Sequence, residues 1–336
     1  MNAFGKLFRV NIFGESHGQL VGIVMDGIPS GIPFSGEDLL ADLGRRKSGA
    51  AGTTPRKEDD IPQIKSGVFE GFTTGAPLLI QVENKNTRSR DYTELRKTPR
   101  PGHADFTAFK KFGGYEDYRG GGHFSGRLTT GIVAAGVLAK KMIAPARVTA
   151  TILEVGGNPD IEAAIDKAIR EEDSIGGIIE CRISGLPAGL GEPFFDSVEA
   201  VLSHMVFSIP AIKGIEFGAG FAAAKMRGSE HNDNFVDVEG HTETNHAGGI
   251  NGGITNGNEV VFRVVVKPTS STHKAQKTMN FESREMQELK VEGRHDTCIA
   301  LRVPVVLEAA TAIAMADLML QAQQIERINQ PKDTIT

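Results

Sequence analysis

The chain has almost none of the residues that mark several large classes of protein. Its 336 residues include only two cysteines, Cys181 and Cys298, which exclude a disulfide framework and a four-thiolate zinc site. Three tyrosines and no tryptophan leave few rings for stacking bases, and a net charge of −5 argues against a broad basic surface. We therefore expect no nucleic-acid partner.

Long apolar runs are missing too. The longest apolar stretches, of which Val260–Val266 is one, are far shorter than a membrane-spanning helix, and this one contains Arg263. The first ten residues lack the apolar core of a signal peptide. The sequence predicts a soluble cytoplasmic protein without membrane contact, long enough for one large domain or two ordinary ones.

Glycine, by contrast, is abundant, with 40 residues. Five polar stretches combine glycine with His, Arg, Ser or Asn. They are Gly14–Gly18, Arg100–Asp105, Arg119–Arg127, Asn245–Gly253 and Gly293–Asp296. Glycine lets the backbone come close to a ligand, while His and Arg side chains bind phosphate groups. Five such stretches along one chain predict a single site for a large, charged ligand.

Two histidines in these stretches are candidates for proton transfer. His17 is followed by glycine and His103 is preceded by glycine, so both are suited to projecting from loops. Protonated imidazole can donate a proton to a leaving group. Asp105, two residues beyond His103, could orient that ring. The simpler interpretation is that both histidines lie in surface turns.

The cationic stretches also have two interpretations. Arg45 and Arg46 end a predicted helix, where they could bind an anion or only interact with the helix dipole. Arg119–Arg127 is the more specific signal, because its glycines lead directly into a helix whose N–H groups can face an anion. Asp296 could serve the site or cap the last helix. No histidine spacing is typical of a metal site, so we expect no metal.

Two parts of the chain resemble each other. Asp26–Phe34 and Ser184–Phe194 are similar glycine-proline turns, and a helix is predicted after each, over Gly36–Arg46 and Ser197–Phe207. Ser35 is the predicted N-cap of the first helix and Asp196 that of the second.

The similarity continues through a strand and a long helix in each part. The strands are predicted within Gly71–Asn84 and Gly253–Pro268, and the helices over Ser125–Ile143 and Cys298–Gln323. The wide apolar faces of both helices predict a buried core. We therefore expect an α+β fold of two similar halves, with a shared layer of helices and antiparallel sheets.

Taken in order, the motifs resemble those of the chorismate synthase family. They are GESHG, RRKSG, RPGHAD, RGGGHFSGR, GLPAGLGEPFFD, NHAGGINGG, KPTSS and GRHD, and the resemblance runs from about Lys6 to Gln323. It implies a β/α/β sandwich assembled as a homotetramer. It also implies one domain over residues 1–336, with duplicated halves of about 1–145 and 146–330.

The resemblance implies an elimination of phosphate and a ring hydrogen from 5-enolpyruvylshikimate 3-phosphate, in a trans-1,4 sense, to give chorismate. It also implies a requirement for reduced FMN, although no net redox change would occur. His17 resembles the acid for the departing phosphate and His103 the histidine that manages protonation of the flavin. Asp296 resembles the aspartate that assists at flavin N5.

The resemblance also implies binding residues. The substrate-binding residues would be Arg45, Arg46, Arg100 and Arg127. The cofactor-binding residues would be His123, Phe124, Ser125, Pro210, Ala211, Gly252, Lys267, Pro268, Thr269, Ser270, Ser271 and Arg294. Nothing in the chain resembles the NADPH-dependent flavin reductase that some members carry, so an external reductant would supply the reduced FMN.

The chain departs from the family pattern at four positions. His123 replaces an arginine, Leu128 replaces a glutamate, and Pro210 stands where many members have asparagine. A further arginine near Gly52 is absent, and Arg56 could replace it. The alternative left open is an inactive or divergent relative that binds a phosphorylated ligand. Another phosphate enzyme, such as a kinase, is disfavoured because the chain lacks a Walker loop and a carboxylate cluster.

Overall fold

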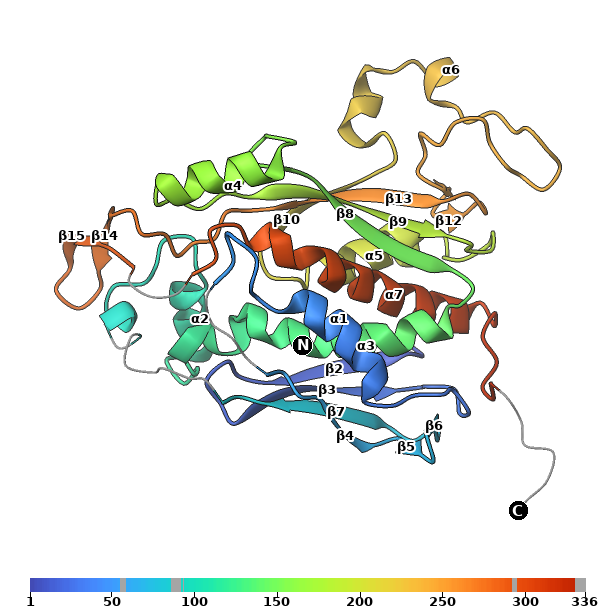
Figure 1. Ribbon diagram of the computed structural model, residues 1–336. Helices are drawn as coiled ribbons and strands as arrows, with labels where there is room; N and C mark the ends of the chain where they lie inside the picture. Colours follow the sequence, from blue (N-terminus) through green and yellow to red (C-terminus); the bar gives the residue numbers. More distant parts are fainter. Residues whose placement is uncertain (55–58, 86–91, 93, 292–294, 330–336) are drawn as a thin grey trace.

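The chain folds into three layers. The structure is a computed structural model that describes residues 1–54, 59–85, 92, 94–291 and 295–329. Figure 1 shows one sheet at the bottom, a layer of helices in the middle and a second sheet above it. All pairings within both sheets are antiparallel. The predicted α+β class, with helices between antiparallel sheets, is confirmed.

The first sheet has five strands in the order β1-β2-β3-β7-β4. They are β1 (Ala3–Phe4), β2 (Arg9–Gly14), β3 (Leu20–Asp26), β4 (Gln63–Ser66) and β7 (Leu78–Glu83). Ile23 of β3 lies opposite Ile80 of β7, and both side chains are buried. Alternating apolar residues of these strands therefore form one side of the core.

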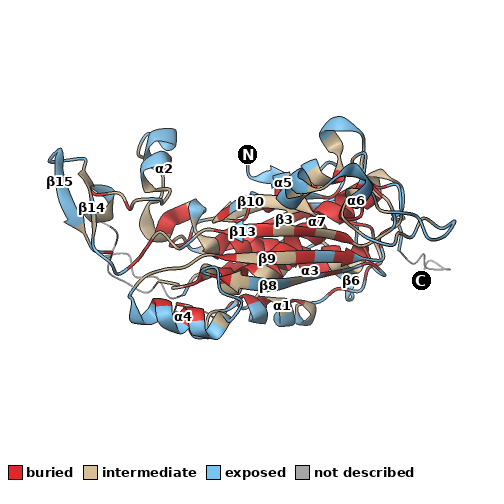
Figure 2. Ribbon diagram, turned by 90° about the horizontal axis from the view of Figure 1, so that it is seen from above, coloured by how far each residue is buried: buried red, intermediate tan, exposed pale blue. Residues whose placement is uncertain are grey.

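The second sheet has four strands in the order β10-β13-β9-β8. They are β8 (Arg147–Val155), β9 (Gly177–Ser184), β10 (Ile212–Phe217) and β13 (Val260–Val266). Phe262 lies opposite Cys181, and both are completely buried. Arg263 points to the other face, where it pairs with Glu216 at 3.0 Å. Helix α4 (Ile161–Arg170) lies beside the β8 edge of this sheet (Figures 1 and 2).

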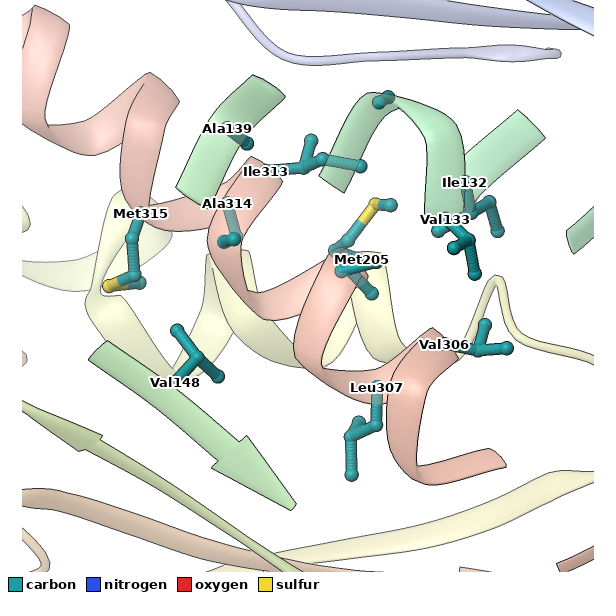
Figure 3. Close-up of a cluster of buried hydrophobic side chains, with 14 of the residues drawn as sticks. Ile132, Val133, Ala139, Val148, Met205, Val306, Leu307, Ile313, Ala314 and Met315 are labelled. Atoms are coloured by element: carbon teal, nitrogen blue, oxygen red, sulfur yellow. The ribbon is translucent and has the colours of Figure 1, made fainter. Parts of the chain in front are cut away.

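Four helices occupy the layer between the sheets. They are α1 (Leu40–Arg46), α3 (Thr129–Met142), α5 (Val198–Val206) and α7 (Val303–Gln321). Apolar side chains of α3, α7, α5 and β8 meet in one buried cluster (Figure 3). At the closest approach of α3 and α7, a Cβ atom on Gly136 would overlap Ala309. Glycine at this position therefore permits the two helices to pack closely.

The segment Ile299–Gln321, which includes α7, is the one described helix long and apolar enough to cross a membrane, but 89% of that apolar window is buried inside the protein. Its wide apolar face packs against α3 and the second sheet. The predicted burial of both long helices is confirmed.

The starts of two helices test the predicted caps. Ser35 Oγ accepts a hydrogen bond from Glu37 N and Asp38 accepts one from Ser35 N, but the N-cap of the first turn (Glu37–Leu39) is Gly36, so the predicted cap at Ser35 is one residue off. At α5, the prediction of Asp196 as the N-cap is wrong. Ser197 accepts from Ala200 N at 3.1 Å, while Asp196 pairs with Lys6.

The two sheets have the same internal order. Apart from β1, the strands of each sheet lie in the order first, second, fourth, third along the chain, namely β2-β3-β7-β4 and β8-β9-β13-β10. In each half, a long core helix follows the last strand. This common order supports duplicated halves of about 1–145 and 146–330, which remain a prediction.

The remaining elements lie outside the three layers. They are α2 (Asp105–Phe112), α6 (Gly228–His231) and three hairpins, β5 (Val68–Phe69) with β6 (Phe72–Thr73), β11 (Ile250–Asn251) with β12 (Ile254–Thr255), and β14 (Gln276–Asn280) with β15 (Glu285–Leu289). Figure 2 shows β15 and much of α6 exposed, whereas α3, α7 and the centre of the second sheet are buried.

Candidate active site

A turn of three glycines lies between His17 and His103, the two candidates for proton transfer. Gly120, Gly121 and Gly122 have φ angles of 60°, 78° and 52°, which favour glycine. A Cβ atom on Gly120 would lie 2.6 Å from His17 Nε2, and one on Gly121 would lie 3.5 Å from His103 Nε2. The turn that leads into α3 therefore brings together two histidines that are far apart in the sequence.

His103 is oriented by a carboxylate, as its sequence spacing predicts. Its Nδ1 lies 2.6 Å from Asp105 Oδ1. Arg100 donates to both oxygens of the same carboxylate, each at 2.8 Å. Burial opposes ionisation of Asp105, but the hydrogen bonds from Arg100 and His103 outweigh it and hold the pKa of Asp105 well below its usual range.

Backbone and side-chain contacts connect the segment Arg100–Asp105 to the segment Lys267–Ser271. Gly102 O accepts from Lys267 Nζ at 3.0 Å and from Ser270 Oγ at 2.7 Å. Arg100 Nη1 donates to Ser271 Oγ at 3.2 Å. Two motifs more than 160 positions apart therefore form one polar wall.

This wall borders a cavity of about 590 Å³, a size typical of cofactor sites. Ten of the predicted cofactor-binding residues line it, namely His123, Phe124, Ser125, Pro210, Ala211, Lys267, Pro268, Thr269, Ser270 and Ser271. Leu128, Ile132 and Met205 add apolar surface. The cavity therefore combines hydroxyl and ammonium donors with an apolar wall.

Two predicted cofactor-binding residues are not among those lining the cavity. Gly252 lies in the turn between β11 and β12 and does not contribute to the cavity wall formed by the described residues. Arg294 lies outside the described residues, as does Arg56.

Buried arginines form the second part of the site. Asp60 accepts from Arg46 Nη2 at 2.6 Å and from Arg127 Nη1 in a very short contact. Arg302 donates from Nε to the Arg46 carbonyl at 3.0 Å. Burial lowers the pKa of Arg46 to about 10; Asp60 opposes this effect, whereas Arg302 and Arg127 add to it. Arg46 still carries its charge at neutral pH.

The arginine cluster adjoins the larger cavity. Arg46 and Arg302 line a smaller cavity of about 40 Å³. Four residues belong to the walls of both cavities, namely Gly126, Thr129, Pro210 and Ile299. An anion held by the arginines would therefore lie next to a ligand in the larger cavity.

Arg45 lies in a different cluster from Arg46. Its guanidinium pairs with both oxygens of the buried Glu308, at 2.6 and 2.7 Å, and also contacts Asp42. Lys140 joins the same two carboxylates. Successive helical residues point about 100° apart. Arg45 and Arg46 therefore belong to two separate polar clusters. Arg45 lines neither the larger nor the smaller cavity.

Asp296 connects the arginines to a loop. Its Oδ1 accepts from Thr54 N at 2.9 Å, and its Oδ2 lies 3.4 Å from Arg302 Nη1. The N-cap position of the helical turn Ile299–Arg302 is Cys298. The alternative that Asp296 caps the last helix is therefore wrong.

Comparison with known proteins decides the family. The sequence profile described as chorismate synthase matches residues 8–320. The chain belongs to the chorismate synthase family. It is 66% identical over 329 residues to the chorismate synthase of Chitinophaga pinensis, a match that covers 98% of this chain and 99% of the relative. It is 45% identical over 359 residues to that of Dehalococcoides mccartyi, with 97% and 99% covered.

A solved structure agrees with this assignment. The crystal structure of a chorismate synthase aligns with a TM-score of 0.73 and 26% identity, over 95% of this chain and 93% of the other. The activity of the chain is therefore that of the family, the formation of chorismate by a lyase of the shikimate pathway.

The contacts of this chain account for three departures from the chorismate synthase pattern. His123 Nδ1 lies 2.9 Å from Gly14 O, and its Nε2 lies 3.2 Å from Asn2 Oδ1. Leu128 is buried against Val21 and Val82 of the first sheet, where a glutamate would be costly. At Gly52, a Cβ atom would lie 2.8 Å from Ile165, and φ is 81°.

Sequence reasoning missed three groups that hold the site together. They are Asp60, Arg302 and Asn84, whose Oδ1 accepts from Arg127 Nε at 3.0 Å. None of them lies in a glycine-rich motif, and each contacts a residue at least 14 positions away. Single-sequence spacing carries no signal for such pairs.

Proposed function

We propose that the protein removes phosphate and a ring hydrogen from 5-enolpyruvylshikimate 3-phosphate, in a trans-1,4 sense, with reduced FMN in the larger cavity and no net redox change. The observation that carries this proposal is that ten residues assigned to flavin by resemblance line a single cavity. That cavity adjoins the cluster of buried arginines.

The residues of the cavity fit a flavin with a phosphate tail. Thr269 Oγ1 is buried without a hydrogen-bond partner among the described residues, so a ligand atom would satisfy it. Lys267, Ser270 and Ser271 would hold the phosphate, while Leu128, Ile132 and Met205 suit a flat apolar ring. When bound, reduced FMN would supply an electron transiently and thereby weaken the C–O bond to phosphate.

The two histidines would manage protons on either side of the glycine turn. His17 would protonate the departing phosphate. Asp105 accepts the Nδ1 proton of His103 and thereby leaves Nε2, which faces Gly121, to exchange a proton with the flavin. Asp296 would assist removal of the ring proton.

The arginines would divide into two classes. Arg46, Arg127 and Arg302 would bind the anionic groups of the substrate, because Arg46 and Arg127 share the buried Asp60, and Arg302 lines the smaller cavity with Arg46. Arg45 and Arg100 would act within the protein instead. Arg45 would stabilise Glu308, and Arg100 would hold Asp105 against His103.

We further propose a cytoplasmic homotetramer that receives reduced FMN from an external reductant. The support is the resemblance together with the absence, in the sequence, of motifs typical of an NADPH-dependent reductase. If the pure protein reduced FMN with NADPH in the dark, the external supply would be disproved.

The decisive experiment is an anaerobic single turnover with reduced FMN and 5-enolpyruvylshikimate 3-phosphate, in which phosphate release, chorismate absorbance and the flavin spectrum are followed together. We expect product with reduced FMN and none with oxidised FMN. His17→Ala should lose at least about a hundredfold in rate. His241→Ala is the matched control, because His241 is an exposed histidine that pairs with Asp237. Bound flavin without phosphate release would favour a divergent ligand-binding relative.

A further inference from the structure

Asp60 holds an unusual position among the charged groups of the site. Its side chain is 1% exposed, and each carboxylate oxygen accepts from a different arginine. Arg46 contacts Oδ2 and Arg127 contacts Oδ1. Burial opposes ionisation of Asp60, but the two guanidinium charges keep its pKa below the ordinary value. Asp60 is therefore a buried anion shared by two buried cations.

The two arginines are also held from behind. Arg127 Nε donates to Asn84 Oδ1 at 3.0 Å, and Asn84 Nδ2 donates to the carbonyl oxygens of Glu15 and Gly18 at 2.9 Å. The backbone of Arg46 accepts from Arg302. The guanidinium of Arg127 is therefore held by Asn84 as well as Asp60, whereas that of Arg46 is held by Asp60 and its backbone by Arg302.

The cluster nevertheless retains capacity for an anion. Arg46 and Arg127 contact Asp60, while Arg302 donates to the Arg46 carbonyl and lies 3.4 Å from Asp296. Positive charge therefore exceeds negative charge by one. Arg46 Nε is buried and has no hydrogen-bond partner among the described residues. A buried N–H without an acceptor costs free energy, which an incoming anion would offset.

We propose that Asp60 is a positioning residue, which stays between Arg46 and Arg127 when substrate binds and holds their guanidinium groups in the geometry that grips the substrate anion. This inference rests on the proposed function, in which both arginines bind substrate. The competing idea is that Asp60 occupies the place of the substrate anion and leaves when substrate arrives. The surplus positive charge and the unpaired Arg46 Nε favour the positioning role, because the cluster can bind a further anion while Asp60 stays in place.

Asp60→Asn tests the proposal with little change in shape. Asp60 has a φ of 47°, a conformation that asparagine also tolerates, so the backbone should be preserved. The amide removes the charge and turns an N–H toward one of the guanidinium groups. We expect KM for 5-enolpyruvylshikimate 3-phosphate to rise about tenfold to a hundredfold, with kcat changed less than about threefold. Calorimetric titration of the flavin-free protein with the same substrate should give a matching loss of affinity.

Asp317→Asn is the matched control. Asp317 is another buried carboxylate, which accepts from the backbone N–H groups of Lys6, Leu7 and Phe8. It lines neither cavity and contacts none of the three arginines. It should lower the melting temperature and leave KM unchanged. A loss of substrate affinity confined to Asp60→Asn therefore cannot come from a general loss of stability.

The outcomes separate the inference from the function on which it rests. Unchanged or tighter substrate binding by Asp60→Asn, together with weakened binding by Arg46→Lys, overturns the positioning role alone. Unchanged binding by both variants removes the arginine cluster from the substrate site. If Asp60→Asn does not fold, Asp60→Glu replaces it. The extra methylene must displace the guanidinium groups, so an unchanged KM in that variant also overturns the proposal.

Discussion

His103 is the residue whose chemistry depends most visibly on a neighbour. Asp105 accepts from its Nδ1 and is itself held by both nitrogens of the Arg100 fork. The carboxylate favours the Nδ1-protonated tautomer of the imidazole, because it can only accept and lies 2.6 Å from Nδ1, whereas Arg100 Nη2, which can only donate, lies 3.1 Å away. The working nitrogen is then Nε2, on the side of the glycine turn.

Asp105→Asn should therefore impair turnover without removing the ring. The amide can donate to Nδ1 as well as accept from it, so it no longer selects the tautomer. We expect kcat to fall about a hundredfold or more. Nitrogen-15 NMR of His103 should show a larger share of the Nδ1-unprotonated form. Asp173→Asn, at an exposed ion pair with Lys274, is the control. Full activity of Asp105→Asn would contradict an orienting role.

At this scale, the sequence predicts residues within one motif better than contacts between motifs. His103 and Asp105 are two positions apart, so their contact could be foreseen. Asp60 meets Arg127 across 67 positions, and no local pattern signals such a pair. Arg45 and Arg46 look equivalent in the sequence, because the face that each occupies depends on the packing of α1.

Among the elements, the crossing of α3 and α7 controls the shared helical layer. Gly136 of α3 lies against the backbone of Ala309 in α7. Elsewhere in the same layer, the position that a Cβ would take on Gly44 of α1 has no atom within 4 Å beyond its chain neighbours and the backbone of its own helix. Two glycines in helices should therefore respond in opposite ways to the same substitution.

Gly136→Ala should destabilise the protein by about 1–3 kcal/mol or more, because the added methyl group forces the helices apart. Gly44→Ala should stabilise it by up to about 1 kcal/mol, because alanine has the higher helix propensity and meets no clash. Denaturant unfolding of both variants measures the difference. Equal effects would show that the close approach of α3 and α7 does not limit the packing.

The existence and type of helices and strands were also predicted better than the residues at which they begin and end. The strand Val260–Val266 lies within the predicted segment Gly253–Pro268, and the helix predicted over Ser197–Phe207 is observed over Val198–Val206. The cap at α5 was misassigned to Asp196 because Asp196 and Ser197 are both good cap residues. The contact with Lys6, nearly 200 positions away, removes Asp196 from the competition.

For the whole molecule, buried carboxylates control stability in acid. Burial opposes ionisation of Asp60, Asp105 and Glu308, but arginine or lysine partners lower the pKa of each. Because the pKa values are lower in the folded state, their contribution to stability is complete above the unfolded values of about 4 and is lost as the pH falls below them.

The melting temperature should therefore hold between pH 6 and about pH 5 and fall steeply below about pH 4. Glu308→Gln should start from a lower melting temperature and show a shallower fall, because one of the three contributions is already gone. Scanning calorimetry across this range measures both. A constant melting temperature down to pH 3 would show that these carboxylates are not stabilising when ionised.

The layer of helices between the sheets makes the two sheets parts of one folding unit. The first sheet packs on α3 and the second on α7, and the two helices pack against each other in one core. A disturbance at their crossing should therefore reach both sheets equally. Native-state hydrogen exchange in Gly136→Ala tests this expectation. Amides of β3 and β9 should exchange faster by the same factor, because that factor is set by the loss of global stability. Gly44→Ala should slow both or leave both unchanged. Acceleration in one sheet alone would mean that the two halves unfold separately.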